Sequence, residues 1–155
     1  QTLRAAGLSP EVLVSGVDET AVAASTVHDV VSRLARHKSE TAAAHLDDDQ
    51  QTTIVIGCDS LLEIDGTAYG KPGSAADAIE RWQRIRGRTG VLHTGHHVLL
   101  RRAGRQLSDS AVASTTGHFA ELTDAEISAN VATGEPLEVA GGFTVDGLGG
   151  AFVSG

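Results

Sequence analysis

The sequence contains no methionine, one cysteine and three prolines, and aromatic residues make up only 3% of its 155 residues. The single cysteine, Cys58, excludes an intramolecular disulfide and fits a reducing cytoplasm. With so few aromatic residues, we expect a core built on Val, Ile, Leu and Ala. No apolar run approaches the roughly 18 residues needed to cross a bilayer, so we expect no membrane partner.

Positively charged residues are also scarce, with 12 Lys and Arg against 20 Asp and Glu. The formal net charge is −8, which argues against nucleic acid as a partner, because such binding depends on neutralising phosphates. Of the 12 basic Lys and Arg residues, only Lys38 and Lys71 are lysines. A local pocket can still be positive on an acidic protein, so a small phosphate ligand is compatible with this charge.

The length and the 41% hydrophobic content fit one compact domain over residues 1–155. Because methionine is absent, we expect the chain to be a segment of a longer polypeptide. Residues 1–6 resemble the tail of a helix capped by Gly7. Further helices are predicted at residues 26–44, 74–86 and 123–134. Strands are predicted at residues 11–17, 53–58, 61–64, 67–69, 92–102, 106–119 and 151–153, with short strands and turns over 141–150. These elements indicate an α/β or α+β domain with a mixed sheet.

The most informative stretch is I-V-I-G-C-D-S-L-L-E-I-D-G-T-A-Y-G-K-P, which runs from Ile54 to Pro72. An apolar, β-branched strand is predicted to end at Asp59, and Asp65-Gly66 marks a tight hairpin. Lys71 follows the hairpin. A carboxylate at a strand end with a lysine nearby can hold a metal ion and a polyphosphate, as nucleotide cleavage requires.

Other polar groups have two interpretations each. The run Asp47-Asp48-Asp49 is either a solvated loop or a metal site, and a loop is the simpler interpretation because no flanking ligands are present. His93, His96 and His97 suggest a zinc site, but alternation along a strand sends His96 and His97 to opposite faces. A histidine-based metallohydrolase therefore stays a weak alternative.

Two further motifs have ordinary explanations. Gly147-Leu148-Gly149-Gly150 lacks the spacing of a dinucleotide fingerprint, so tight chain reversal accounts for it better than phosphate binding. Cys58 precedes the acid, and we expect it to point into the core as a small apolar residue.

Several ordered motifs resemble the Maf family of nucleoside triphosphate pyrophosphatases. The motif V-I-G-C-D-S followed by G-K-P is similar to the family's central motif. The stretches S-G-V-D-E, L-A-R-H-K-S, G-R-T-G-V-L-H-T-G, F-A-E-L-T-D-A-E-I and G-E-P-L-E-V-A-G-G-F-T-V-D-G-L-G-G-A-F-V resemble further family motifs in the same order. The resemblance covers nearly the whole chain and is more specific than one short pattern.

The resemblance implies an elongated α/β fold with flanking helices, similar to inosine triphosphatases, in which two lobes surround a central cleft. It implies hydrolysis of a nucleoside triphosphate to the monophosphate and pyrophosphate with Mg²⁺ or Mn²⁺. It also implies a cytoplasmic homodimer linked to inhibition of septum formation.

Site residues follow from the matched motifs. Asp59 matches the family's proton acceptor and would also bind metal, together with Glu19. Lys38 and Lys71 would contact the triphosphate. Ser60 and Asp146 match positions linked to substrate choice.

The sequence departs from the family pattern in several places. The N-terminal phosphate-gripping loop and the last strand and helix are not found within the chain. Asp146 replaces the glutamine of pyrimidine-specific members, which leaves the preferred base open. These departures motivate an alternative function, a non-catalytic nucleotide-binding regulator of cell division.

Overall fold

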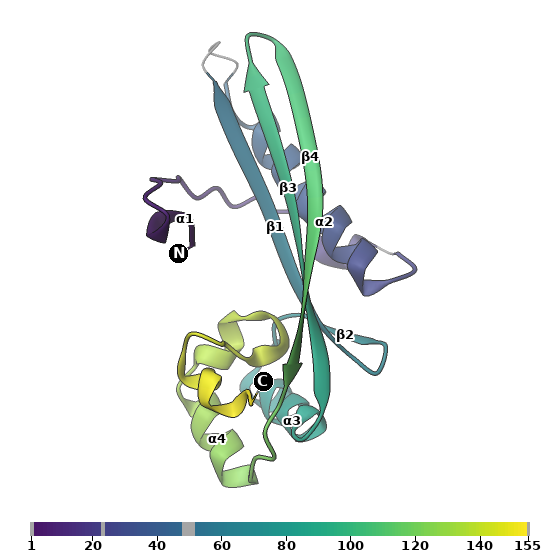
Figure 1. Cartoon of the computed structure of the whole chain (residues 1–155), viewed down its shortest axis with the longest axis vertical. Helices are drawn as coiled ribbons and strands as arrows, with labels where there is room; N and C mark the ends of the chain where they lie inside the picture. Colours follow the sequence, from purple (N-terminus) through teal and green to yellow (C-terminus); the bar gives the residue numbers. More distant parts are fainter. Residues whose placement is uncertain (1, 23, 48–51, 155) are drawn as a thin grey trace.

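The computed structural model describes residues 2–22, 24–47 and 52–154. Figure 1 shows an elongated molecule in which long strands run nearly its full length. The α-helices are α1 (Thr2–Ala5), α2 (Val27–Ala44), α3 (Ala75–Ile85) and α4 (Asp124–Ala132). The strands are β1 (Thr53–Ile64), β2 (Thr67–Tyr69), β3 (Thr89–Arg102) and β4 (Arg105–His118). Short 3-10 helices are η1 (Glu19–Ala21), η2 (Glu135–Glu138), η3 (Ala140–Gly142) and η4 (Leu148–Phe152).

The strands form one sheet in the order β2-β1-β3-β4. The turn predicted at Asp65-Gly66 is present, and a second two-residue turn at Ala103-Gly104 joins β3 and β4. All four residues adopt the positive φ angles that such hairpin turns require. The predicted α/β fold with flanking helices is confirmed. All strand pairings among the described residues are antiparallel, however, so the expected mixed sheet is corrected to an antiparallel one.

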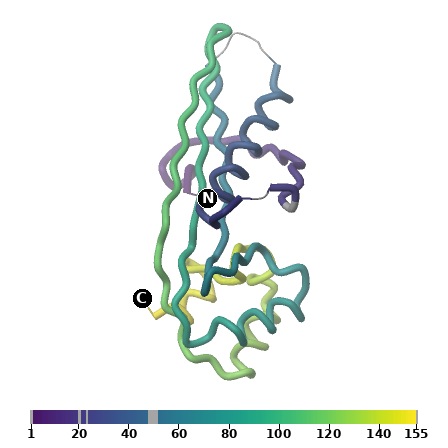
Figure 2. Tube along the Cα trace, turned by 90° about the vertical axis from the view of Figure 1, so that its right-hand side faces the viewer, coloured from purple at the N-terminus to yellow at the C-terminus, as the bar shows by residue number. Residues whose placement is uncertain are grey.

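The helices gather at the two ends of the long sheet, α2 at one end and α3 and α4 at the other, and this divides the molecule into two lobes (Figures 1 and 2). Val55, Gly57 and Leu99 are buried on the face toward α2. Further along β1, Leu62 and Ile64 are even-numbered and so point to the opposite face, where they are buried with α3 and α4. We call the end of the molecule where α2 packs on β1 and β3 the α2 lobe. We call the other end, with α3, α4 and η2–η4, the C-terminal lobe.

The α2 lobe is held together by close backbone approach. A Cβ atom on Gly57 would overlap the carbonyl oxygen of Ala35, and one on Gly95 would overlap that of Val31. Because glycine has no side chain, α2 can lie directly on β1 and β3. Thr26 begins the helix as predicted, since its side chain accepts a hydrogen bond from the Asp29 N–H.

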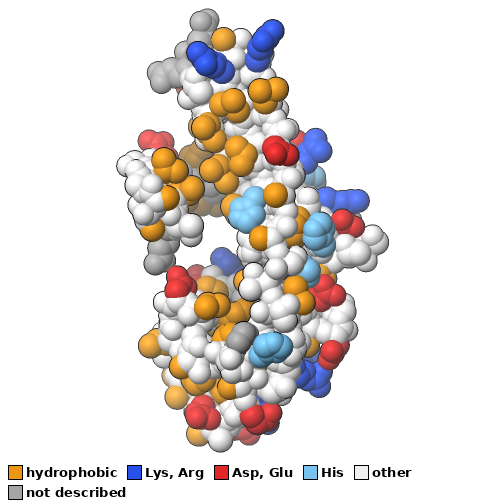
Figure 3. Space-filling model, in the orientation of Figure 1, with side chains coloured by type: hydrophobic (Ala, Val, Ile, Leu, Met, Phe, Trp, Pro, Cys, Tyr) orange, Lys and Arg blue, Asp and Glu red, His pale blue; other side chains and the backbone are white. Residues whose placement is uncertain are grey.

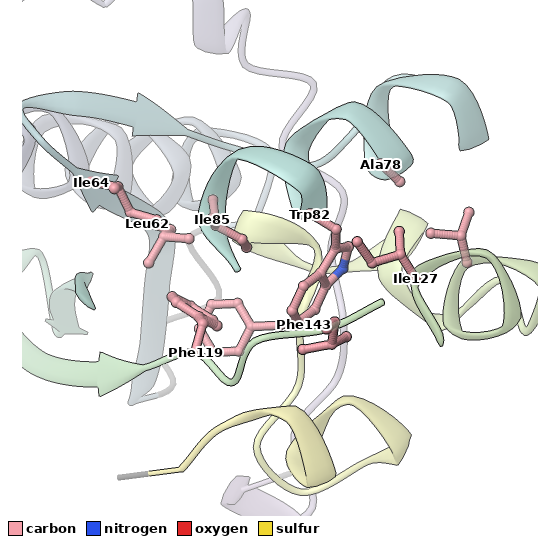
Figure 4. Close-up of a cluster of buried hydrophobic side chains, with 10 residues drawn as sticks. Leu62, Ile64, Ala78, Trp82, Ile85, Phe119, Ile127 and Phe143 are labelled. Atoms are coloured by element: carbon pink, nitrogen blue, oxygen red, sulfur yellow. The ribbon is translucent and has the colours of Figure 1, made fainter. Parts of the chain in front are cut away.

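The C-terminal lobe has a conventional hydrophobic core built around Trp82, which is completely buried. Figure 4 shows Trp82 of α3 among the rings of Phe119 and Phe143. The Trp82 and Phe119 rings meet edge to face with 5.9 Å between their centroids, and the indole N–H donates to the Gly142 carbonyl at 2.9 Å. α4 begins with the predicted capping box of Thr123 and Glu126.

Some expected strands are absent. Residues 11–17 contain no strand, and Val12 and Val14 are 79% and 94% exposed there. Residues 141–150 form 3-10 helices and loops, and the strand expected at 151–153 is reduced to one bridge between Phe119 and Val153. The N-terminal helix is confirmed over its described part, with Gly7 at its C-terminal end at φ +82°. Within the described residues, no helix combines the length and apolar character that crossing a membrane demands.

Candidate functional site

A cavity of about 550 Å³ lies beside β1, between the two lobes. Figure 3 shows the surface hollowed there, between the N-terminal segment and the C-terminal lobe. Every site residue predicted from the sequence lines this cavity: Glu19, Lys38, Asp59, Ser60, Lys71 and Asp146. Segments that are far apart along the chain therefore meet at one place. The roles of these residues in catalysis and binding stay predictions.

Lys38 is the centre of a charged cluster. Its ammonium nitrogen lies 2.5 Å from a carboxylate oxygen of Asp59 and 2.6 Å from one of Glu19. The Asp59 side chain is 8% exposed, whereas the Lys38 and Glu19 side chains are 22% and 59% exposed. Helix α2 brings Lys38 to the sheet, and η1, which begins at Glu19, brings that carboxylate to Lys38.

Burial controls the acidity of this cluster. Burial raises the pKa of Asp59, and the hydrogen bond and charge of Lys38 offset only part of that effect. For Lys38 the balance is reversed, because burial lowers its pKa but the bonds to Asp59 and Glu19 outweigh it and the pKa is raised. Asp59 is thus a carboxylate of increased basicity, paired with an ammonium that stays charged.

The position of Asp59 differs from the prediction. The strand does not end at the acid, since β1 continues to Ile64 and Asp59 pairs with Gly95 in its middle. The cavity reaches Asp59 because, among the described residues, this part of β1 has a strand partner on one side only. Cys58 was also predicted wrongly, since it is exposed and lines the cavity. Alternation turns Asp59 toward α2 and turns Cys58 the other way.

The turn after β2, which carries Lys71, is held in place by hydrogen bonds to Gly70. The Gly70 carbonyl accepts hydrogen bonds from the Arg81 guanidinium at 2.5 Å and from the Gly141 N–H at 2.9 Å. Arg81 also stacks over the Tyr69 ring, 5.3 Å from its centroid. Lys71, directly after Gly70, contributes to the positive charge that acts on the pKa of Asp59. Arg81 was not singled out in the sequence, and its place in a helix gave no signal.

The opposite wall of the cavity comes from the C-terminal lobe, and most of it was missed in the sequence. Glu138 and Val139 at the end of η2 line the cavity, as do Phe143, Thr144 and Val145. Short 3-10 helices carry no periodicity that would have identified these positions. On the β1 side, the Ser60 hydroxyl lies 2.9 Å from the Thr94 hydroxyl.

The histidines do not form a metal site. His97 is 3% exposed and bonds to the Ser110 hydroxyl through Nδ1. His93 bonds to the Ser114 hydroxyl at 2.8 Å and to the Glu63 carboxylate at 3.0 Å. Within the described ranges, no group of three or more His, Cys, Asp or Glu side chains is arranged to hold a metal ion. In the run Asp47-Asp48-Asp49, Asp48 and Asp49 lie outside the described residues.

Asp59 and Glu19 carry carboxylate oxygens, which are the type of ligand that Mg²⁺ and Mn²⁺ prefer. Two protein carboxylates are few for a permanent metal site, but Mg²⁺ commonly uses one or two carboxylates together with substrate phosphates and water. The donor set therefore fits a divalent ion that binds together with a phosphate ligand.

The fold and the site together define an α/β protein whose interlobe cavity gathers acids and lysines from separate segments. The whole chain, residues 1–155, matches the family model described as "Maf-like protein", and the chain belongs to the Maf family. A protein of Salinispora tropica named "Nucleoside triphosphate pyrophosphatase" is 56% identical over 154 residues, which are 99% of this chain and 67% of that protein. A protein of Streptomyces coelicolor with the same name is 52% identical over 153 residues, 99% of this chain and 72% of its own length.

Proposed function

We propose that this chain is a nucleoside triphosphate pyrophosphatase, which hydrolyses a nucleoside triphosphate to the monophosphate and pyrophosphate. The observation that carries the proposal is the meeting of Glu19, Lys38, Asp59 and Lys71 at one cavity. Its volume of about 550 Å³ is in the range of small-molecule sites. Family membership and the names of the similar bacterial proteins support the same activity.

Asp59 is the proposed proton acceptor. Hydrolysis between the α- and β-phosphates needs a base beside the attacking water, and a carboxylate whose pKa is raised by burial is a stronger base than an exposed one. Lys38 holds the carboxylate in one orientation at 2.5 Å. A triphosphate entering the cavity would compete for the Lys38 ammonium and so release Asp59 for the water.

Lys38 and Lys71 are the proposed phosphate ligands. Each lysine is a compact charge on a flexible stem, so it can follow phosphate oxygens as they move. Glu19 and Asp59 would hold the divalent ion, which neutralises charge on the polyphosphate when it is bound. Lys38 now occupies the space between these two carboxylates, so ion binding and the movement of Lys38 toward phosphate are expected to be coupled.

Ser60 and Asp146 are proposed to contribute to base selection, because they line the cavity from different lobes. An ionised carboxylate only accepts hydrogen bonds. Asp146 should therefore favour a base whose edge presents N–H donors, such as guanine, over the carbonyl-flanked edge of uracil.

The alternative, a non-catalytic regulator, is less well supported because the cavity retains both acids and both lysines. A regulator needs the lysines to bind phosphate but has no use for a buried base. Location in the cytoplasm, dimer formation and a link to septum formation stay predictions from the family resemblance.

The test is a nucleotide panel on the protein with Mg²⁺ or Mn²⁺, in which pyrophosphate release is measured. We expect equal amounts of pyrophosphate and nucleoside monophosphate from at least one triphosphate, and guanine nucleotides to be better substrates than uracil nucleotides. A protein that binds triphosphates and melts at higher temperature with them, but consumes none, would be a regulator. Release of single phosphates would also contradict the proposal.

A further inference from the structure

Glu135, the first residue of η2, accepts three hydrogen bonds from the segment that follows Phe143. Its carboxylate accepts one from the Thr144 hydroxyl, one from the Leu148 N–H at 3.1 Å and one from the Gly149 N–H at 3.0 Å. These bonds hold the pKa of Glu135 below its ordinary value of 4.5, with the Thr144 hydroxyl as the largest cause. The carboxylate therefore stays ionised and bound at neutral pH.

The segment that Glu135 holds, residues 144–149, forms part of the cavity wall. Thr144, Val145 and Asp146 line the cavity, and so does Glu138 at the other end of η2. Glu135 itself is not among the lining residues. It thus connects two segments of the wall without lining the cavity itself. One segment carries Asp146 and the other carries Glu138.

The contact is tightly packed. A Cβ atom on Gly147 would lie 2.6 Å from a Glu135 carboxylate oxygen, and one on Gly149 would lie 3.0 Å from the Thr144 backbone nitrogen. Because these distances are shorter than normal contacts, only glycine fits at either position without displacing a neighbour, and the segment lies close against Glu135 and Thr144.

We propose that Glu135 is a positioning residue for base selectivity: it fixes residues 144–149 and thereby sets where Asp146 meets the nucleobase. The proposal rests on the proposed function. Glu135 is separate from the chemistry, since the charges that act on the pKa of Asp59 are those of Lys38, Glu19 and Lys71. Loss of Glu135 should therefore change recognition of the base and leave the catalytic step largely intact.

The first experiment compares Glu135→Ala and Glu135→Gln in the nucleotide panel. In Glu135→Ala, we expect the ratio of kcat/KM between the best and the worst base to fall about tenfold through KM, with kcat for the best nucleotide changed less than about threefold. Glu135→Gln should lie between Ala and wild type, because one amide oxygen can still accept from Thr144 and Gly149 but not from Leu148.

The matched control is Glu126→Gln. Glu126 also accepts hydrogen bonds, including a backbone N–H, in the C-terminal lobe, but it caps α4 and does not line the cavity. Its base ratio should equal that of wild type. A second perturbation, Gly147→Ala, pushes the Glu135 carboxylate aside without removing it and should lower the base ratio in the same direction.

An NMR titration tests the anchor without any activity. The Leu148 and Gly149 amide shifts should follow ionisation of Glu135, with a midpoint below 4.5, and should not titrate in Glu135→Gln. The Thr123 amide, which donates to Glu126, should titrate in both proteins.

The measurements distinguish failure of the positioning role from failure of the proposed function. An unchanged base ratio in Glu135→Ala, an equal loss of kcat for all nucleotides, or a wild type without base preference overturns the positioning role while leaving the pyrophosphatase activity in place. If the wild type hydrolyses nothing, the proposed function fails. The same ratios are then measured as nucleotide affinities, and equal ratios in wild type and Glu135→Ala overturn the positioning role as well.

Discussion

The α2 lobe and the C-terminal lobe are stabilised in opposite ways. In the α2 lobe, the core cluster of Ala42, Ala43, Val55 and Leu99 is small, and the helix lies on glycines. In the C-terminal lobe, Trp82 and its aromatic neighbours fill a larger core. Lys38 and Asp59, which carry the proposed chemistry, belong to the first lobe, whereas Asp146, proposed to contact the base, belongs to the second. The scaffold that holds Lys38 against Asp59 therefore depends on the absence of side chains at Gly57 and Gly95, whereas the core of the C-terminal lobe depends on large aromatic side chains.

The largest expected effect is on the charged cluster. Asp59→Asn should lower kcat about a thousandfold, because the amide cannot accept the proton. Burial raises the folded-state pKa of Asp59 above its unfolded value, so ionisation destabilises the fold as pH rises through that pKa. The variant removes this cost but also removes the ion pair that raises the pKa of Lys38, so the two effects oppose and its stability at neutral pH should stay close to that of wild type. Steady-state kinetics and thermal melting measure both effects. Asp109→Asn, at an exposed position on β4, is the control, and wild-type activity in Asp59→Asn would remove Asp59 from the mechanism.

Next in size is the aromatic core. Trp82→Ala should lower the free energy of unfolding by about 4 kcal/mol, because it leaves a cavity and an unpaired Gly142 carbonyl. Urea denaturation measures this loss. Leu107→Ala, at a position 69% exposed on β4, should change stability by less than about 0.5 kcal/mol. A similar loss in both variants would mean that the lobe does not depend on its aromatic centre.

Lys38→Met should lower kcat/KM about a hundredfold, through the loss of a phosphate ligand. The pH profile gives the sharper result. Lys38 lowers the pKa of Asp59 against the effect of burial, so its removal raises that pKa further. Since the base must be ionised, the acid limb of kcat/KM should move to higher pH. Arg36→Met removes another cation of α2, at an exposed position, and should leave the profile unchanged.

The smallest of these effects tests the glycine contact. Gly57→Ala should destabilise the protein by about 2 kcal/mol, because the new Cβ would overlap the Ala35 carbonyl on α2. Gly117→Ala is the matched control on β4, since its Cβ would meet only Val153 at an ordinary distance of 4.0 Å. Equal stability of the two variants in urea denaturation would show that α2 can move away from the sheet at little cost.

Local signals in the sequence predicted most of the regular structure. Thr26, Ser74 and Thr123 begin helices because their side chains bond to nearby backbone N–H groups, and such caps depend on adjacent residues alone. The turn at Asp65-Gly66 is local in the same sense. Residues 11–17 alternate like a strand but form none, since a strand needs a partner and pattern alone does not supply one.

The site was predicted only in part. Residues within recognisable motifs, such as Asp59 and Lys71, were identified, and all six predicted site residues line the cavity. The position of Asp59 in mid-strand was missed, because strand pairing past the acid is a tertiary property. Glu135 was missed because its partners Thr144, Leu148 and Gly149 lie 9 to 14 residues away, a spacing that has no helical or strand meaning.

The long strands also limit how the protein can move. β1, β3 and β4 each run unbroken from one lobe into the other, with continuous pairing between β1 and β3 over Thr53–Glu63. No loop between the lobes along these strands can act as a hinge. Opening the interlobe space would require the sheet itself to twist, so a nucleotide should enter by displacing side chains such as Lys38 rather than by swinging two rigid halves apart.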